Sequence, residues 1–275
     1  MTLSTIRNNP AKQKKVKTKK QKAIAATCAV AFWLLVWHVV SLCVGSELVL
    51  VSPVKVVQTL FTVIFDPNFL KTAWYSAARI LGGFFTALTL GTVLGWVASR
   101  FWVVETLLRP ITAVIKATPV ASFIILVLLW FSGKNLSVII SMLMVFPVIY
   151  MNVLEGIRSA DEKLLEMAQV FRLSVGKKLL YIYLPAVAPF FVSACSVSLG
   201  LCWKSGIAAE VIGTPDGSIG AVFYQAKIFL QTSELLAWTV VVVAVSVAFE
   251  KLFMFLLRLI LKKLKMEDVL NGKRA

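Results

Sequence analysis

Residues 159–185 read SADEKLLEMAQVFRLSVGKKLLYIYLP and lie between two long apolar blocks. Ser159 and Glu162 have the spacing of a capping box, in which side chains satisfy the first backbone N–H groups of a helix. An apolar stripe follows at helical spacing and consists of Leu164, Leu165, Ala168 and Phe171. The sequence therefore predicts a short amphipathic helix between the two apolar blocks.

A second, shorter stripe follows a break at Arg172 and Ser174, and it consists of Val175, Leu179 and Ile182. Pro185 fits the opening turn of the next helix, where a missing N–H costs nothing. We expect two short helices at an angle, each with an apolar face. Such a pair could lie on lipid or dock on a protein. Its acidic residues favour a protein partner, because carboxylates are disfavoured at an anionic lipid surface.

The composition excludes a soluble enzyme. Of 275 residues, 59% are hydrophobic and only 15% are charged, and the mean hydropathy is +0.85. Six apolar blocks are long enough to cross a bilayer as helices, at about 20 residues each: 23–44, 77–98, 111–131 (interrupted by Pro119), 136–153, 186–209 and 235–261. The predicted fold is an all-α, polytopic membrane bundle of about six transmembrane helices with a helix–turn–helix outside the membrane.

Lys and Arg gather in alternate connections, which sets the orientation of a membrane protein. They crowd residues 7–22, 100–109, 158–178 and 258–274, whereas the other connections carry only Lys55, Lys71, Lys134 and Lys227. We therefore expect both termini and the helix–turn–helix to be cytoplasmic. The basic tail of residues 1–22 is expected to meet anionic lipid rather than nucleic acid, and to be followed by an uncleaved first span.

Few residues have the chemistry of a catalytic or metal site. The four cysteines, Cys28, Cys43, Cys195 and Cys202, lie in or beside apolar blocks and form no C-x-x-C pair. His38 is the only histidine, so no metal site is expected. A membrane-embedded enzyme is disfavoured for the same reason.

The helix–turn–helix also carries a motif. Glu166, Met167 and Ala168, followed by Ile182-x-Leu184-Pro185, resemble the Glu-x-Ala…Ile-x-Leu-Pro coupling loop of permeases of ATP-binding cassette (ABC) importers. Arg172 stands where that family usually has glycine. Because glycine tolerates positive φ and arginine does not, we expect the turn to shift toward Gly176.

The resemblance continues along the chain. The further matching residues are Ser76, Arg79, Gly83, Phe84, Pro119, Trp130-Phe131-x-Gly133, Phe146-Pro147, Asn152, Gly156, Ala209-Glu210-x-Ile212-Gly213 and Gly217-x-x-Gly220. They resemble the branch that imports nitrate, aliphatic sulfonates, taurine and some pyrimidine vitamin precursors. The implied organisation is a basic tail (1–22), a permease domain (23–265, with the coupling loop at about 158–185) and a short cytoplasmic tail (266–275).

The chain itself has no phosphate-binding loop. Gly133-Lys134, Gly176-Lys177 and Gly272-Lys273 lack the upstream glycine and the following Ser or Thr. The resemblance implies that ATP and Mg²⁺ are bound by cytoplasmic ATPase subunits, and that the other partners are an external solute-binding protein and a second permease copy. It assigns ATPase coupling to Leu164, Leu165, Glu166, Met167, Ala168, Phe171, Gly176 and Pro185.

Two basic residues in the spans are candidates for the translocation pathway. Lys204 lies in the fifth block and Arg79 in the second, and an ionisable group in a span is a functional candidate by default. Each could instead extend its charge to the membrane surface. A stand-alone, ion-coupled transporter remains the alternative function, although it usually buries several charges and carries inverted repeats.

Overall fold

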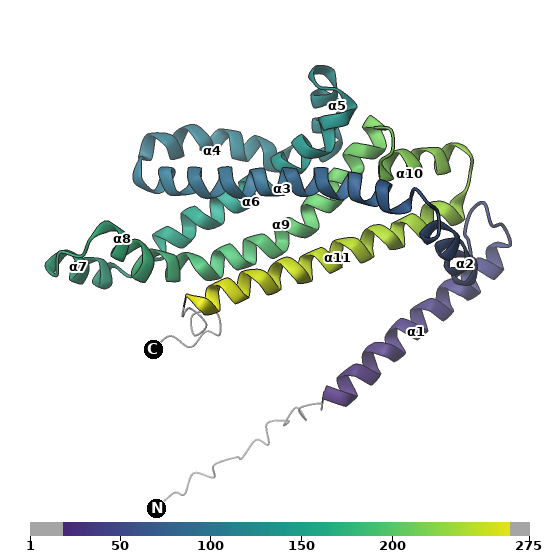
Figure 1. Cartoon of the computed structure of the whole chain (residues 1–275), viewed down its shortest axis with the longest axis horizontal. Helices are drawn as coiled ribbons and strands as arrows, with labels where there is room; N and C mark the ends of the chain where they lie inside the picture. Colours follow the sequence, from purple (N-terminus) through teal and green to yellow (C-terminus); the bar gives the residue numbers. More distant parts are fainter. Residues whose placement is uncertain (1–18, 265–275) are drawn as a thin grey trace, which may run out of the picture. The chain divides into compact units, whose positions relative to one another are not determined.

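The computed structural model describes residues 19–264, and every regular element in this range is helical (Figure 1). The chain forms two compact units, one ending at Lys55 and one beginning at Val56. The first unit contains α1 (Lys19–Val44), whose stretch Thr27–Val44 is long and apolar enough to cross a bilayer. Residues 1–18 and 265–275, which include most of the predicted basic tail and the C-terminal tail, lie outside the described residues.

The second unit holds the remaining helices, although α2 begins just before the division between the units. They are α2 (Pro53–Ile64), α3 (Phe69–Arg100), α4 (Trp102–Ala117), α5 (Val120–Trp130), α6 (Gly133–Arg158), α7 (Glu162–Val170), α8 (Val175–Lys178), the π-helix η1 (Leu179–Tyr183), α9 (Leu184–Gly213), α10 (Ile219–Ile228) and α11 (Thr232–Lys263). Five of the described helices, α1 included, are long and apolar enough to span a membrane, and the bent pair of α4 and α5 would make a sixth. The predicted all-α polytopic bundle of about six spans is confirmed.

The third predicted span differs from the expectation. Residues 111–131 do not form one helix: α4 begins at Trp102, and α4 and α5 are bent by 110° at Thr118 and Pro119. Proline disfavours helical geometry in the residue before it, and Thr118 adopts an extended conformation with ψ of 133°. The pair is therefore a broken span or a re-entrant loop.

The core of the second unit lies where α6 packs between α3 and α9 (Figure 1). Buried residues from these three helices meet there, among them Ile80, Phe84, Val145, Ile149, Leu199 and Trp203. The evenly spaced small residues Gly83, Ala87, Gly91 and Gly95 face this contact. Gly91 lies against Ile149, and Gly95 lies against Val153. The small-residue stripe therefore packs within the chain, with α3 close against α6.

At one end of this bundle α7 and α8 project beyond the long helices, and at the other end α10 lies across the ends of α3 and α9 (Figure 1). The long helix α11 runs along α9 and packs Trp238 and Val241 against α10 and α2. Its other face is largely exposed apolar surface, as expected of a helix that faces lipid or another chain.

Candidate functional site

The predicted helix–turn–helix is present as α7, α8 and η1, between the spans α6 and α9. The start of α7 differs from the predicted capping box. Asp161 is the N-cap and its side chain accepts a hydrogen bond from the Lys163 backbone N–H at 2.9 Å, whereas the Ser159 hydroxyl donates to the Gly156 carbonyl at 2.8 Å. An aspartate at this position satisfies an orphan N–H group and also complements the helix dipole.

The predicted single stripe of α7 is divided between two faces. Ala168 is 1% exposed and packs with the partly buried Leu165 against Ile182 of η1. The opposite side leaves apolar side chains in the open: Leu164, Met167, Val170 and Phe171, with Glu166 also exposed. The inner face thus fixes α7 to the bundle, and the outer face is free to contact another protein.

The turn after α7 is made at Arg172 and not at Gly176, which corrects the predicted shift. Arg172 adopts φ of 50°, while Gly176 lies inside α8 with ordinary helical geometry. The Leu173 N–H bonds to the Ala168 carbonyl at 2.9 Å, and the Arg172 N–H bonds to the Gln169 carbonyl at 3.0 Å. These two bonds form a Schellman motif, and Leu173 adds the apolar contact that commonly accompanies it.

The segment is continuous with the spans that follow it. A π-helix over Leu179–Tyr183 runs directly into α9, and π-helical turns occur frequently at functional sites. The Tyr183 ring meets the Trp96 ring of α3 edge-on, with centroids 5.7 Å apart. Contacts thus link α7 through η1 to α9 and to the end of α3.

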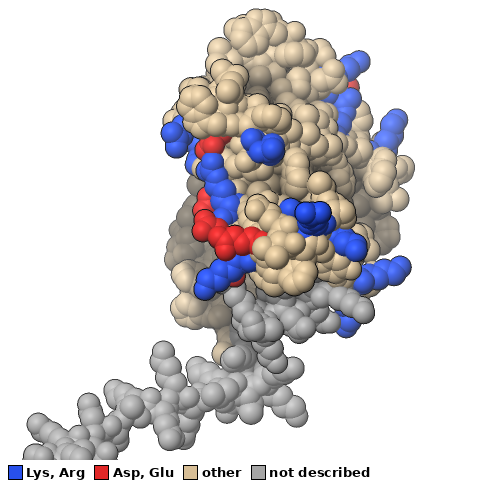
Figure 2. Space-filling model, turned by 90° about the vertical axis from the view of Figure 1, so that its left-hand side faces the viewer, with Lys and Arg blue, Asp and Glu red and all other residues tan. Residues whose placement is uncertain are grey.

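The same end of the second unit carries a mixed charge pattern. Figure 2 shows Lys and Arg side chains spread over this end, with the Asp and Glu side chains gathered on one side. Arg158, the last residue of α6, forms a 2.5 Å ion pair with Glu105 in the first turn of α4. This pair joins two helix ends next to the projecting segment.

At the opposite end, a buried polar cluster holds the N-terminus of α10. The Ser76 hydroxyl donates to Glu210 Oε2 at 2.6 Å and accepts from the Ile219 N–H at 2.9 Å. The Gly220 N–H points to the same carboxylate oxygen at 3.4 Å, and Ser218 caps the Ala221 N–H at 3.0 Å. The first three N–H groups of α10 are therefore satisfied by α3, by α9 and by the N-cap, with a carboxylate at the positive end of the helix dipole.

Arg79 lies beside this cluster and has structural contacts. Its guanidinium donates to the Lys134 carbonyl at the start of α6 and lies 4.1 Å from the centre of the Tyr75 ring. The hydrogen bond joins α3 to α6, and the cation–π contact within α3 stabilises the arginine in place.

Lys204 and Glu250 are ionisable residues in spanning helices. Lys204 projects from α9 as an exposed side chain without an ion-pair partner among the described residues. Glu250 of α11 accepts a hydrogen bond from the Ser196 hydroxyl of α9 at 3.0 Å. The sequence reasoning missed Glu250, although a carboxylate inside the apolar block 235–261 was a usable signal.

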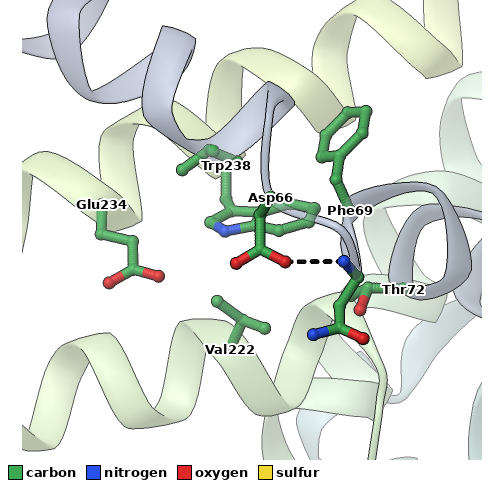
Figure 3. Close-up of a pocket in the computed structure, with 8 residues that line it drawn as sticks. Asp66, Phe69, Thr72, Val222, Glu234 and Trp238 are labelled. Atoms are coloured by element: carbon green, nitrogen blue, oxygen red, sulfur yellow. Dashed lines mark hydrogen bonds between the residues drawn. The ribbon is translucent and has the colours of Figure 1, made fainter.

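A hollow of about 120 Å³ opens near the turn between α2 and α3. Figure 3 shows Asp66 and Glu234 directed toward it, beside Val222 and the indole of Trp238. The dashed line marks the bond from the Asn68 backbone N–H to Asp66 at 2.6 Å. Its two carboxylates and its aromatic wall favour a cationic group, and the sequence reasoning had singled out none of these residues.

The described residues contain no group of three His, Cys, Asp or Glu side chains that could hold a metal ion. What the second unit does present is a bundle of membrane spans with a rigidly attached amphipathic segment at one end. These features are typical of a polytopic membrane protein with an element outside the bilayer that is suited to contact a partner protein.

Comparison with known proteins agrees with this class. Residues 87–266 match the family of binding-protein-dependent transport system inner membrane components, and the chain belongs to this family. It is 29% identical over 232 residues to a Bacillus subtilis (strain 168) protein named as an aliphatic sulfonates transport permease, with 83% of each chain covered.

Two further relatives have similar coverage. A taurine transport system permease protein of Escherichia coli (strain K12) is 27% identical, over 78% of this chain and 80% of the relative. A nitrate import permease protein of Synechocystis sp. (strain ATCC 27184 / PCC 6803 / Kazusa) is 25% identical, over 74% of this chain and 76% of the relative. The chain is thus a multi-pass membrane permease of an ABC importer, a non-catalytic subunit that works with an ATPase and a solute-binding protein.

Proposed function

We propose that this permease uses the exposed face of α7 as its contact with the ATPase, and we call residues 158–185 the coupling segment. One observation carries the proposal: Leu164, Met167 and Phe171 are exposed apolar residues on a helix that is fixed to the bundle from its other side. An exposed apolar face on a projecting element marks a protein contact. Glu166 is exposed on the same helix beside this face, one turn before the exposed Val170, and adds a charge that a groove on the ATPase would recognise.

The residues predicted to couple have different tasks in this proposal. Glu166, Leu164, Met167 and Phe171 contact the ATPase. Ala168 and Leu165 position α7 from inside, and Pro185 begins the span α9 that moves with the segment. ATP and Mg²⁺ stay on the ATPase, and closure of the two ATPases tilts the segment between two discrete packings.

The substitution Glu166→Lys tests the contact in membranes that hold the permease, its ATPase and its binding protein. We expect solute uptake to be lost while membrane insertion and permease abundance stay unchanged. Gln169→Lys is the matched control, because it places a lysine on the same helix off the exposed apolar face. Full uptake by Glu166→Lys would contradict the role of this face.

The proposed substrate is a small anion such as a sulfonate, taurine or nitrate. The relatives named above are permeases for aliphatic sulfonates, taurine and nitrate. In this chain Lys204 supports an anion, because an unpaired cation exposed on a spanning helix is costly in lipid and is expected to face an aqueous pathway. We propose that two copies of the chain enclose this pathway, with both termini and the coupling segment in the cytoplasm.

Lys204→Met tests the pathway role. We expect uptake of the anion to fall, with the larger effect on the concentration needed for half-maximal rate, because a favourable charge is removed. Lys227→Met, in the last turn of α10, is the control. An unchanged rate and an unchanged preference among sulfonates, taurine and nitrate would remove Lys204 from the pathway.

A further inference from the structure

A pocket of about 370 Å³ lies between the end of α3 and the second half of the coupling segment. Its wall is formed by Trp96, Ser99 and Arg100 at the end of α3, by Ile157 of α6, and by Val175, Lys178 and Tyr183 of the coupling segment. The pocket therefore joins the end of one span to the element that contacts the ATPase.

The pocket is positively charged and its charge is not balanced. Arg100 and Lys178 both line it, no acidic residue does, and neither forms an ion pair with a described residue. Arg158 at the end of α6 differs, because Glu105 pairs with it at 2.5 Å. Two like charges that share a pocket repel each other, and an anion between them removes that repulsion. The chemistry of the lining thus selects an anionic group.

The aromatic wall indicates the depth of the pocket in the membrane. Trp96 and Tyr183 meet edge-on, and Trp96 lies one turn before the last residue of α3. Tryptophan and tyrosine are enriched at the level of the lipid headgroups. Val93 lies about one turn before Trp96 in α3, on the side away from the helix end. It is 54% exposed and offers an apolar surface to an acyl chain.

We propose that this pocket binds the headgroup of an anionic phospholipid of the cytoplasmic leaflet. Basic pockets between spanning helices on the cytoplasmic side are suited to such headgroups. A lipid, unlike a free anion, uses the cations, the aromatic wall and the adjoining apolar surface together. Because Lys178 and Tyr183 belong to the coupling segment, the bound headgroup would fix that segment to the end of α3. The proposal rests on the proposed cytoplasmic position of the coupling segment.

The test uses the full chain in nanodiscs of phosphatidylcholine that contain a minor fraction of phosphatidylglycerol with a photoreactive headgroup. After irradiation, mass spectrometry quantifies and maps the attached lipid. We expect the label on the peptides that contain Trp96–Arg100 and Val175–Tyr183. For the pair Arg100→Gln and Lys178→Gln we expect the label to fall roughly 30-fold, from the contribution of two cations near an anionic surface.

The matched control is the pair Arg109→Gln and Lys177→Gln, which removes the same charge from the same end of the second unit but outside the pocket. We expect this pair to keep its label. Arg100→Lys keeps the charge and should keep most of the label, which distinguishes a lost site from a misfolded chain. An equal loss in both pairs, or a label on other peptides, would overturn the site.

A further arm distinguishes the source of the anion. Inorganic phosphate is added to the nanodiscs before irradiation, and we expect the label to persist; displacement by phosphate would show a site for free anions and reject the lipid. The labelling needs neither an ATPase nor a substrate, so a failure of the coupling proposal leaves its result intact. The orientation is measured separately in intact cells, where the reaction of Val175→Cys with a thiol reagent that cannot cross the bilayer is compared with that of the unmodified chain and its four cysteines.

Discussion

The Ser76 hydroxyl donates to the Glu210 carboxylate at 2.6 Å, although 134 residues separate the two along the chain. This bond joins α3 to α9, and the Ile219 N–H completes it by bonding to Ser76 at 2.9 Å. Three helices are thus held at one buried point, at the end of the second unit opposite the coupling segment. Both residues are fully buried, so water cannot replace the bonds they make.

Ser76→Ala is expected to destabilise the permease. It leaves the first N–H of α10 without its partner and leaves Glu210 Oε2 with only the 3.4 Å contact from the Gly220 N–H, and an unsatisfied buried group costs about 1–3 kcal/mol. Thermal unfolding in detergent, followed by circular dichroism, should show a lower Tm. Thr89→Ala, which removes an exposed hydroxyl bonded to its own helix, is the control and should leave the Tm nearly unchanged. Equal Tm values for the two variants would contradict the structural role of Ser76.

The neighbouring glycines Gly82 and Gly83 should respond oppositely to alanine. A Cβ at Gly83 would lie 2.4 Å from the Val138 carbonyl oxygen of α6, whereas a Cβ at Gly82 meets no atom within 4 Å. Gly83→Ala must therefore push α3 away from α6, at a cost of about 1–3 kcal/mol. Gly82→Ala gains helix propensity, up to ~1 kcal/mol.

Thermal unfolding of the two variants measures this difference. The comparison is matched because each variant replaces one glycine of α3 by alanine, so the two have the same amino-acid composition. A lower Tm for Gly83→Ala and an equal or higher Tm for Gly82→Ala is the expected result. A Tm for Gly83→Ala as high as that of the unmodified chain would mean that the close approach of α3 and α6 does not contribute to stability.

The sequence predicted the parts of the structure that depend on local pattern. Apolar length located the straight spans. The motif residues Ser76, Glu210 and Gly220 were all noticed as family matches. Their convergence on one polar cluster was not predictable, because it depends on the packing of α3, α9 and α10 and not on any local periodicity.

The coupling segment shows the same division. Its existence and position followed from the apolar stripes and the motif, but the inner and outer faces of α7 did not. Leu165 and Ala168 turn inward because η1 presents Ile182 to them, and the sequence does not show that contact. The turn at Arg172 was mispredicted because backbone preference alone was weighed, whereas the Schellman bonds and the Leu173 contact hold Arg172 in its left-handed conformation.

Arg172→Gly should stabilise the end of α7. A left-handed conformation costs an L-residue roughly 1–2 kcal/mol, and glycine avoids this cost at the expense of a more flexible unfolded chain, so we expect a net gain of about 0.5–1 kcal/mol. Hydrogen–deuterium exchange measures it locally, because the Leu173 N–H that bonds to Ala168 should exchange more slowly. Arg172→Ala removes the same side chain but keeps the backbone cost, and it should bring no slowing. Slower exchange in both variants would instead assign the effect to the arginine side chain.

The inner face of α7 gives the last prediction, which concerns the transmission of force. Ala168 is 1% exposed against Ile182, whereas Val170, two residues further along the same helix, is 79% exposed. Ala168→Leu inserts a larger side chain into a filled contact, at about 1–3 kcal/mol, and should lift α7 away from η1. The outer face that meets the ATPase would be unchanged, so the ATPase should still bind and hydrolyse ATP while uptake falls.

Val170→Leu, the control, adds apolar bulk on the exposed side and should leave transport per ATP intact. The decisive quantity is solute imported per ATP hydrolysed: if Ala168→Leu kept the same ratio as Val170→Leu, rigid attachment of α7 through its inner face would not be how the ATPase moves the spans.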